Sequence, residues 1–64
     1  MRIEDAYALA SRVLVRLADG QIGRLVVFRL RNESVDVQLP GGQLRTVPST
    51  ALRLQDGFMV EQPA

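Results

Sequence analysis

A chain of 64 residues can form one domain at most, and folding removes only about 60% of its unfolded surface from water. The sequence contains neither cysteine nor histidine, which excludes disulfides, thiolate metal sites and any reaction that needs an imidazole base. Eight arginines and no lysine balance seven acidic residues to a net charge of +1, which is a smaller basic excess than nucleic-acid-binding proteins usually carry.

The sequence has no apolar run close to the ~20 residues that span a bilayer, and its first residues do not follow a signal-peptide pattern. We therefore expect a cytoplasmic protein without membrane contact.

Residues 3–10 have the spacing of an amphipathic helix. One face of this helix is expected to carry the apolar residues at i, i+3, i+4 and i+7, namely Ile3, Ala6, Tyr7 and Ala10. Glu4 and Asp5 lie in the first turn, where the helix dipole favours negative charge. A helix of about eight residues is not stable alone in water, so it is expected to pack on an apolar surface.

The first strand is predicted over residues 12–18, and Asp19-Gly20 predicts a hairpin turn into a long second strand over residues 21–31. On the first strand Val13, Val15 and Leu17 are expected to face inward, and Arg12, Leu14 and Arg16 outward. A two-residue loop would pair Val13 with Val26 and turn Arg24 inward. A three-residue loop with a bulge would place Leu25 and Val27 inward, opposite Val15 and Val13, and move Arg24 outward beside Arg16. A second bulge would then have to return Phe28 and Leu30 to the core.

Residues 35–39 alternate between apolar and polar side chains, as a half-buried strand does, with Val35, Val37 and Leu39 facing inward. The turn at Asn32-Glu33 is expected to pair Leu30 with Val35. Gly41-Gly42 predicts a two-residue type I′ hairpin, which would place Leu39 opposite Leu44 and Val37 opposite Thr46.

Pro48 cannot donate to a strand ladder and is expected to end the fourth strand. Ser49 and Thr50 predict a 3₁₀ turn, and residues 52–54 predict a closing strand with Leu52 and Leu54 on one side. The apolar run 58–60 is expected to add a strand segment, cover the barrel end or remain an exposed patch.

Five short strands joined by local hairpins predict an all-β, five-stranded small barrel in which strand order follows the sequence. The predicted single domain, residues 1–64, comprises a helix over 3–10, a barrel over 12–55 and a tail over 56–64.

Residues 12–55 resemble an SH3-like barrel of the Tudor and KOW kind. Residues 12–26 resemble a KOW segment, in which a glycine precedes an apolar strand, and residues 35–54 resemble the ending of a Tudor domain. The resemblance implies an SH3-like fold. Tudor domains that read methylated side chains use a cage of aromatic rings. Residues 12–55 contain a single aromatic residue, Phe28, patterned inward, so no cage is expected.

A fainter likeness links the chain to plasmid-encoded (type II) dihydrofolate reductase, through Pro40-Gly41, Pro48 and Ala51-Leu52. The pore strand of that family carries a Val-Gln-Ile-Tyr motif, whereas residues 44–47 here read Leu-Arg-Thr-Val. The enzymatic activity is therefore not carried over, and we predict a non-catalytic protein with no cofactor and no metal.

The candidate partner-binding residues are outward arginines and apolar residues without obvious cover: Arg12, Arg16, Arg24, Arg45, Arg53, Leu14, Leu25, Val27, Phe58 and Met59. Because strands one, two and five are neighbours in SH3-like barrels, Arg12, Arg16, Arg24 and Arg53 are expected to form one patch. Asp36 is expected on an exposed strand face, as the ion-pair partner of Arg45 or Arg53.

Two functions fit these residues. The first is a protein-binding module that contacts a protein partner, or itself, through its sheet edge and uncovered apolar residues. The alternative is sequence-nonspecific binding of RNA or DNA through the arginines, which would weaken steeply with salt.

Overall fold

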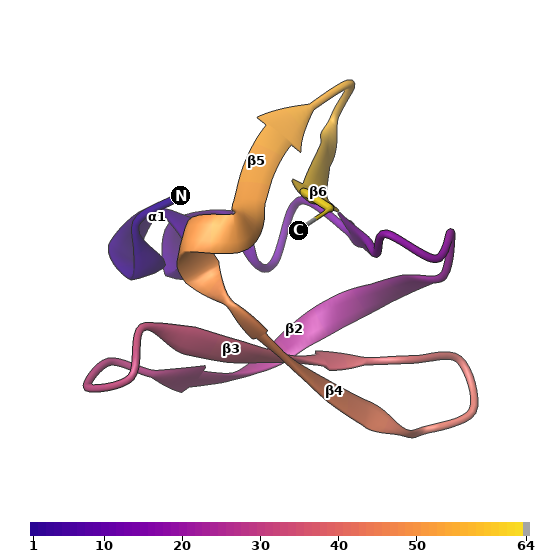
Figure 1. Ribbon diagram of the computed structural model, residues 1–64, viewed down its shortest axis with the longest axis horizontal. Coiled ribbons are helices and arrows are strands. Elements are labelled where there is room, and N and C mark those ends of the chain that lie inside the picture. Colours follow the sequence, from indigo (N-terminus) through magenta and orange to yellow (C-terminus); the bar gives the residue numbers. More distant parts are fainter. Residues whose placement is uncertain (64) are drawn as a thin grey trace.

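The computed structural model describes residues 1–63, which form one α-helix, one 3₁₀ helix and six strands (Figure 1). In chain order these are α1 (Ile3–Leu9), β1 (Val15–Arg16), β2 (Ile22–Arg29), β3 (Ser34–Gln38), β4 (Leu44–Pro48), η1 (Ser49–Ala51), β5 (Leu52–Gln55) and β6 (Phe58–Glu61). The mainly-β fold with a short N-terminal helix and a 3₁₀ turn is confirmed. The described residues contain six strands rather than five, because residues 58–61 pair as a further strand.

The strands form one mixed sheet in the order β4-β3-β2-β1-β6-β5. In Figure 1 the β2–β3–β4 meander lies at the bottom and the β5–β6 hairpin rises above it, with α1 to one side. The expectation that strand order follows the sequence is wrong after β4. β5 lies at the opposite end of the sheet from β4, and β6 lies between β5 and β1, with which it pairs in parallel. Met59 explains this position, because its N–H donates to the Leu14 carbonyl (2.9 Å) and its side chain is fully buried.

The core is formed mainly by side chains of the sheet, with Ile3 and Ala6 of α1, and contains most of the residues expected to face inward. Its buried apolar residues are Ile3, Ala6, Val15, Leu17, Leu25, Val35, Val37, Leu39, Val47, Leu52 and Met59. Tyr7 is 63% exposed, although its ring meets that of Phe28 edge-on at 5.1 Å between centroids. The helix therefore docks through Ile3 and Ala6.

The first hairpin has a three-residue connection. Leu17 N–H donates to the Gln21 carbonyl (2.8 Å), and Gly20 adopts a positive φ of 92°. Leu25 is buried and Arg24 exposed, but the predicted pairing is wrong by two residues, because Gly23 and not Leu25 lies opposite Val15. A bulge is present in β2, where pairing with β3 shifts between Leu25 and Val27, but it does not return Leu30 to the core.

The prediction for the next turn is wrong by two positions. Phe28, not Leu30, lies opposite Val35, because residues 30–33 form a longer turn in which Glu33 has a positive φ of 50°. Phe28 is half-buried against the core, whereas Leu30 is exposed in the turn.

The Gly41-Gly42 hairpin is also one residue longer than predicted. Leu39 N–H donates to the Gln43 carbonyl (2.8 Å), so residues 40–42 form the loop and Val37 lies opposite Arg45. This loop needs a positive φ only at Gly42 (88°). Leu44 consequently leaves the core and is 56% exposed.

The end of the sheet follows the prediction up to Leu52. Pro48 ends β4, η1 follows it, and Leu52 is buried. Leu54 is not in the core, because β5 is an outer strand of the sheet and its hairpin projects away from the core (Figure 1).

Candidate docking groove

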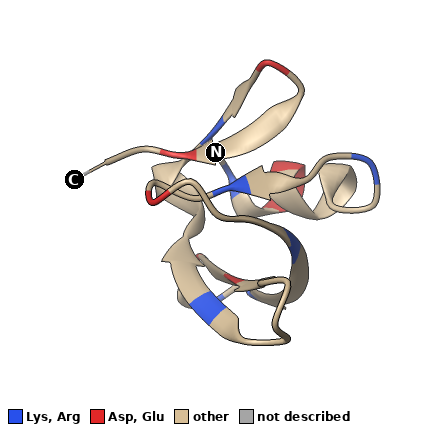
Figure 2. Cartoon of the chain, turned by 90° about the vertical axis from the view of Figure 1, so that its right-hand side faces the viewer, with Lys and Arg blue, Asp and Glu red and all other residues tan. Residues whose placement is uncertain are grey.

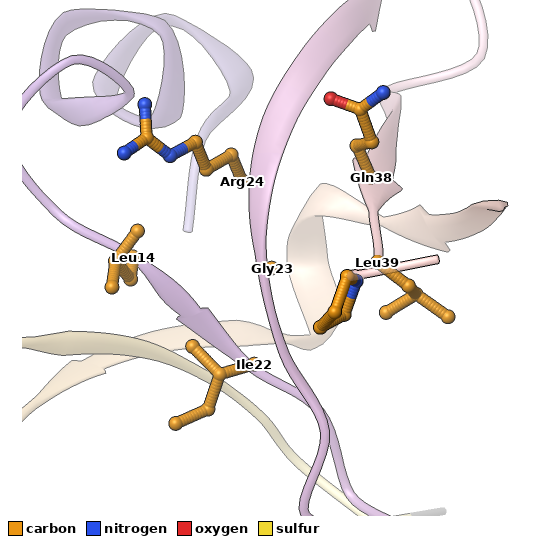
Figure 3. Close-up of a pocket in the computed structure, with 7 residues that line it drawn as sticks. Leu14, Ile22, Gly23, Arg24, Gln38 and Leu39 are labelled. Carbon is orange, nitrogen blue, oxygen red and sulfur yellow. The ribbon is translucent and has the colours of Figure 1, made fainter. Parts of the chain in front are cut away.

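Two adjoining hollows on the outside of β1 and β2 share Leu14 and Arg24. The larger, of about 330 Å³, is lined by Leu14, Ile22, Gly23, Arg24, Gln38, Leu39 and Pro40 (Figure 3). The smaller, of about 270 Å³, is lined by Ala10, Ser11, Arg12, Val13, Leu14 and Arg24. We call their combined lining the β1–β2 groove.

At Gly23, which lines the larger hollow, β3 approaches β2 closely. A Cβ atom on Gly23 would lie 2.3 Å from the Gln38 carbonyl oxygen and 2.7 Å from Val37 Cγ1. These separations are too short for any side chain, so only glycine lets the two strands pack this way. In the view of Figure 3, Leu14, Ile22 and Arg24 lie on one side of the β2 backbone and Gln38 on the other.

The floor of the groove is apolar and partly open to water. Leu14 is 40% exposed and Ile22 is 41% exposed. Both are outward-facing because their strand neighbours Val15 and Gly23 are buried, and side chains alternate across a sheet. A partner that covers them would remove apolar surface from water.

The polar groups of the groove are basic. Arg12 and Arg24 are both exposed, and neither takes part in an ion pair within residues 1–63. Within the same part of the chain the lining contains no carboxylate. The groove thus combines an apolar floor with two guanidinium groups that can each contact an anion bidentately.

The other predicted arginines lie elsewhere. Arg16 lies over the Phe58 ring, 5.2 Å from its centroid, and Arg45 donates to Asp19 Oδ2 (2.9 Å). Arg53 lines a separate hollow beside α1. Since β6 separates β5 from β1, the expectation that strands one, two and five are neighbours is wrong, and Arg53 does not join Arg12 and Arg24. Figure 2 shows arginines distributed over several elements.

Only one of the predicted apolar binding residues lies in the groove. Leu14 lies in the groove, but Leu25 and Met59 are buried and unavailable to a partner. The first hairpin's register turns Leu25 inward, and Met59 lies on β6 between β1 and β5. Val27 and Phe58 are half-buried outside the groove.

Several groove residues were not predicted as binding residues, among them Ile22, Gln38 and Pro40. The structure places Ile22 opposite Arg16, where the three-residue loop was expected to place Arg24, so neither predicted register identifies Ile22. Gln38 and Pro40 reach the groove through the β2–β3 register, which depends on a turn longer than predicted and a bulge between Leu25 and Val27.

Asp36 belongs to an ion pair of the sheet and not to the groove. Its carboxylate is buried and accepts two bonds from Arg29 (2.5 and 2.8 Å) and one from Thr46 Oγ1 (2.7 Å). The bonds from Arg29, and then that from Thr46, hold the pKa of Asp36 below its ordinary value. The predicted partners Arg45 and Arg53 are wrong, because the β2–β3 register brings Arg29 diagonally across from Asp36.

Asp19 stabilises the first turn. The Gln21 backbone N–H (3.0 Å), the Gln21 side chain (2.8 Å) and Arg45 all donate to its carboxylate. In that order of importance these bonds lower the pKa of Asp19 to about 2.

Within residues 1–63, no three His, Cys, Asp or Glu side chains gather into a possible metal site. None of the helices in this part of the chain is both long and apolar enough to cross a membrane. No family model matches the sequence, and no match is found among curated proteins or solved structures.

Proposed function

We propose that this chain is a non-catalytic protein-binding module whose docking surface is the β1–β2 groove. Its partner would be a segment in which a carboxylate side chain lies next to an apolar one. The observation that carries this proposal is the juxtaposition of exposed Leu14 and Ile22 with Arg12 and Arg24, in a lining without a carboxylate among the described residues.

The apolar and the basic side chains of the groove would contribute to binding in different ways. Covering Leu14 and Ile22, each about four-tenths exposed, contributes about 1 kcal/mol apiece. Paired guanidinium and carboxylate groups add orientation and selectivity more than affinity, because both remain close to water. The interaction is therefore expected to be weak and reversible.

The resemblance to SH3-like barrels remains part of this proposal. It is supported by the β1–β2–β3–β4 meander followed by η1 and β5, which is the order of elements expected over residues 12–55. In this proposal β6 is an addition to that arrangement.

Nucleic-acid binding is the alternative, because Arg12 and Arg24 would also contact phosphates. Proteins that hold single strands combine a basic groove with aromatic side chains on which bases stack. The lining described above contains no aromatic residue, and the net charge of the chain is only +1. These observations favour a protein partner.

A displayed library of random twelve-residue peptides, selected on the immobilised protein, tests the proposal. We expect the selected peptides to contain Asp or Glu beside an apolar residue. Their binding should fall about tenfold, or about 1.4 kcal/mol, on Arg24→Ala and be unchanged on Arg31→Ala, an exposed arginine outside the groove.

Selected peptides that bind Arg24→Ala as well as the parent protein would overturn the groove as the docking surface, as would a selection without binders. A parallel titration with mixed-sequence RNA at low salt examines the alternative. If RNA binds, loses affinity on Arg24→Ala, and the peptides do not bind, the groove is a phosphate site and the proposed function is wrong.

A further inference from the structure

The outer strand β5 has two residues, Leu52 and Leu54, whose backbone groups do not bond to β6, and the Leu52 N–H donates instead to the Ser49 carbonyl. Gln62 N–H donates to the Ala51 carbonyl (2.7 Å), and hydrogen-bonded positions alternate along an antiparallel pair. Arg53 and Gln55 are therefore the β5 residues that bond to β6. Met59, which lies opposite Leu54, donates its N–H to β1 instead (2.9 Å to the Leu14 carbonyl). The N–H and C=O of Leu54 consequently point to the open edge.

The two outer strands of the sheet differ in how well they are protected from pairing with another chain. β4 ends in Pro48, which has no N–H, and prolines at an edge hinder pairing. β5 has neither a proline nor a register shift against β6. On β5 the Leu52 carbonyl already accepts a bond from the Met1 nitrogen (2.8 Å), which leaves Leu54 as the free position.

The surface around Leu54 is largely apolar. Its side chain is 53% exposed and lines a hollow of about 530 Å³ with Met1, Asp5, Ala8, Leu9, Leu52 and Arg53. The rim contains one carboxylate, Asp5, and one guanidinium, Arg53, neither of which forms an ion pair within residues 1–63. A second copy would bring the same two residues, so each copy offers a charge of either sign to the other.

We propose that two copies of the chain pair through β5, antiparallel, about a two-fold axis at Leu54. Each Leu54 N–H would donate to the Leu54 carbonyl of the other copy, and the two leucine side chains would cover one another. The same register places Arg53 opposite Gln55 of the second copy, so no like charges oppose each other. A second copy fits this edge because a two-fold axis at Leu54 places the free N–H of each copy opposite the free C=O of the other.

The interface is expected to be small. Stable dimers usually bury 1,200–2,000 Å² in total, as an order-of-magnitude guide, whereas β5 has four residues. The proposed pairing is therefore weak, with monomers at low micromolar concentration and dimers near roughly 1 mM. It involves strands outside the β1–β2 groove and does not depend on the proposed function.

Sedimentation equilibrium from roughly 20 µM to 1 mM, with hydrogen exchange at each concentration, tests this pairing. We expect the average mass to rise toward that of a dimer while exchange of the Leu54 amide slows. Leu54→Lys should raise the dissociation constant at least about tenfold. Leu44→Lys is the matched control, because Leu44 is similarly exposed on the opposite edge strand β4 and should leave dimerisation unchanged.

A strict monomer at 1 mM would overturn the proposal. It would also be overturned if Leu54→Lys still dimerises, if Leu44→Lys abolishes the dimer, or if the Leu54 amide exchanges at the same rate at all concentrations. Protection of the Leu54 amide by library peptides, but not by concentration, would show that a peptide strand and not a second copy occupies the edge. Peptide selection through Arg24 is independent of every one of these results.

Discussion

At the scale of single residues, Gly23 has the strictest requirement on its identity. It is buried in β2, and the Gln38 carbonyl occupies the space that a side chain would need. Its φ is not positive, so the constraint is steric and not conformational. Gly41 offers a contrast, because a Cβ atom there would meet nothing within 4 Å.

We predict that Gly23→Ala lowers the free energy of unfolding by about 1–3 kcal/mol, since β2 and β3 must separate to admit the methyl group. Gly41→Ala is the control and should leave stability unchanged or raise it by up to about 1 kcal/mol, because alanine restricts the unfolded chain. Urea denaturation of the two variants measures both effects. Equal stability of the two variants would contradict the close approach of β3 to Gly23.

At the scale of elements, the meander β2–β3–β4 is joined across its outer face by Asp36. This one carboxylate, on the central strand of the three, accepts bonds from Arg29 on β2 and Thr46 on β4. Each of the other two strands therefore donates to the same buried group. By comparison, the Arg2–Glu4 pair at the start of α1 is exposed (3.2 Å).

We predict that Asp36→Asn lowers stability measurably, whereas Glu4→Gln, the same carboxylate-to-amide change in the exposed pair, leaves it unchanged within error. The amide introduced by Asp36→Asn has one acceptor oxygen where the carboxylate has two, and it leaves the Arg29 charge without a counterion. Thermal unfolding followed by circular dichroism compares the two variants. A loss in Glu4→Gln equal to that in Asp36→Asn would refute the special role of this pair.

The elements also show how much of the structure the sequence predicts. Val35 and Val37 identify β3, and Pro48 with Ser49 identifies the end of β4 and η1, because each of these signals is local. Loop length is not read as securely, since glycine serves both a two-residue and a three-residue hairpin. This difference of one residue in the length of the Gly41-Gly42 loop decides whether Leu44 lies in the core or in water.

The candidate site likewise contains some residues that the sequence predicts and others that it does not. Arg12, Leu14 and Arg24 were predicted to face outward, and the structure brings them together in the groove. Gln38 and Pro40 join them because the longer turn and the bulge in β2 set a β2–β3 register that local patterns did not predict. Met59 was misplaced for the same reason, since nothing near it in sequence specifies β1 as its neighbour.

At the scale of the whole molecule, carboxylates and not histidines set the acid response, because the chain has no histidine. Asp19 titrates with a pKa of about 2 in the folded state, and the pKa of Asp36 is also lowered. Unfolded aspartates titrate near 4, as a rough guide. Between these values the unfolded state binds more protons, so stability falls as the pH falls.

We predict that the free energy of unfolding has its full carboxylate contribution above about pH 4 and loses it progressively toward about pH 2. A double variant, Asp19→Asn with Asp36→Asn, should be less stable at neutral pH and show a shallower decline below about pH 4. Urea titrations at several pH values provide the measurement. An unchanged slope in the double variant would show that other groups cause the acid loss.

The parallel pairing of β1 with β6 has a consequence for the order of assembly. The β2–β3–β4 meander forms from neighbouring segments, whereas Val15 acquires its second strand neighbour only when Met59 arrives from the far end of the chain. Closing so long a loop costs entropy before any contact compensates it, which slows folding. A nascent chain would therefore keep part of its apolar interior exposed until the segment that carries β6 leaves the ribosome.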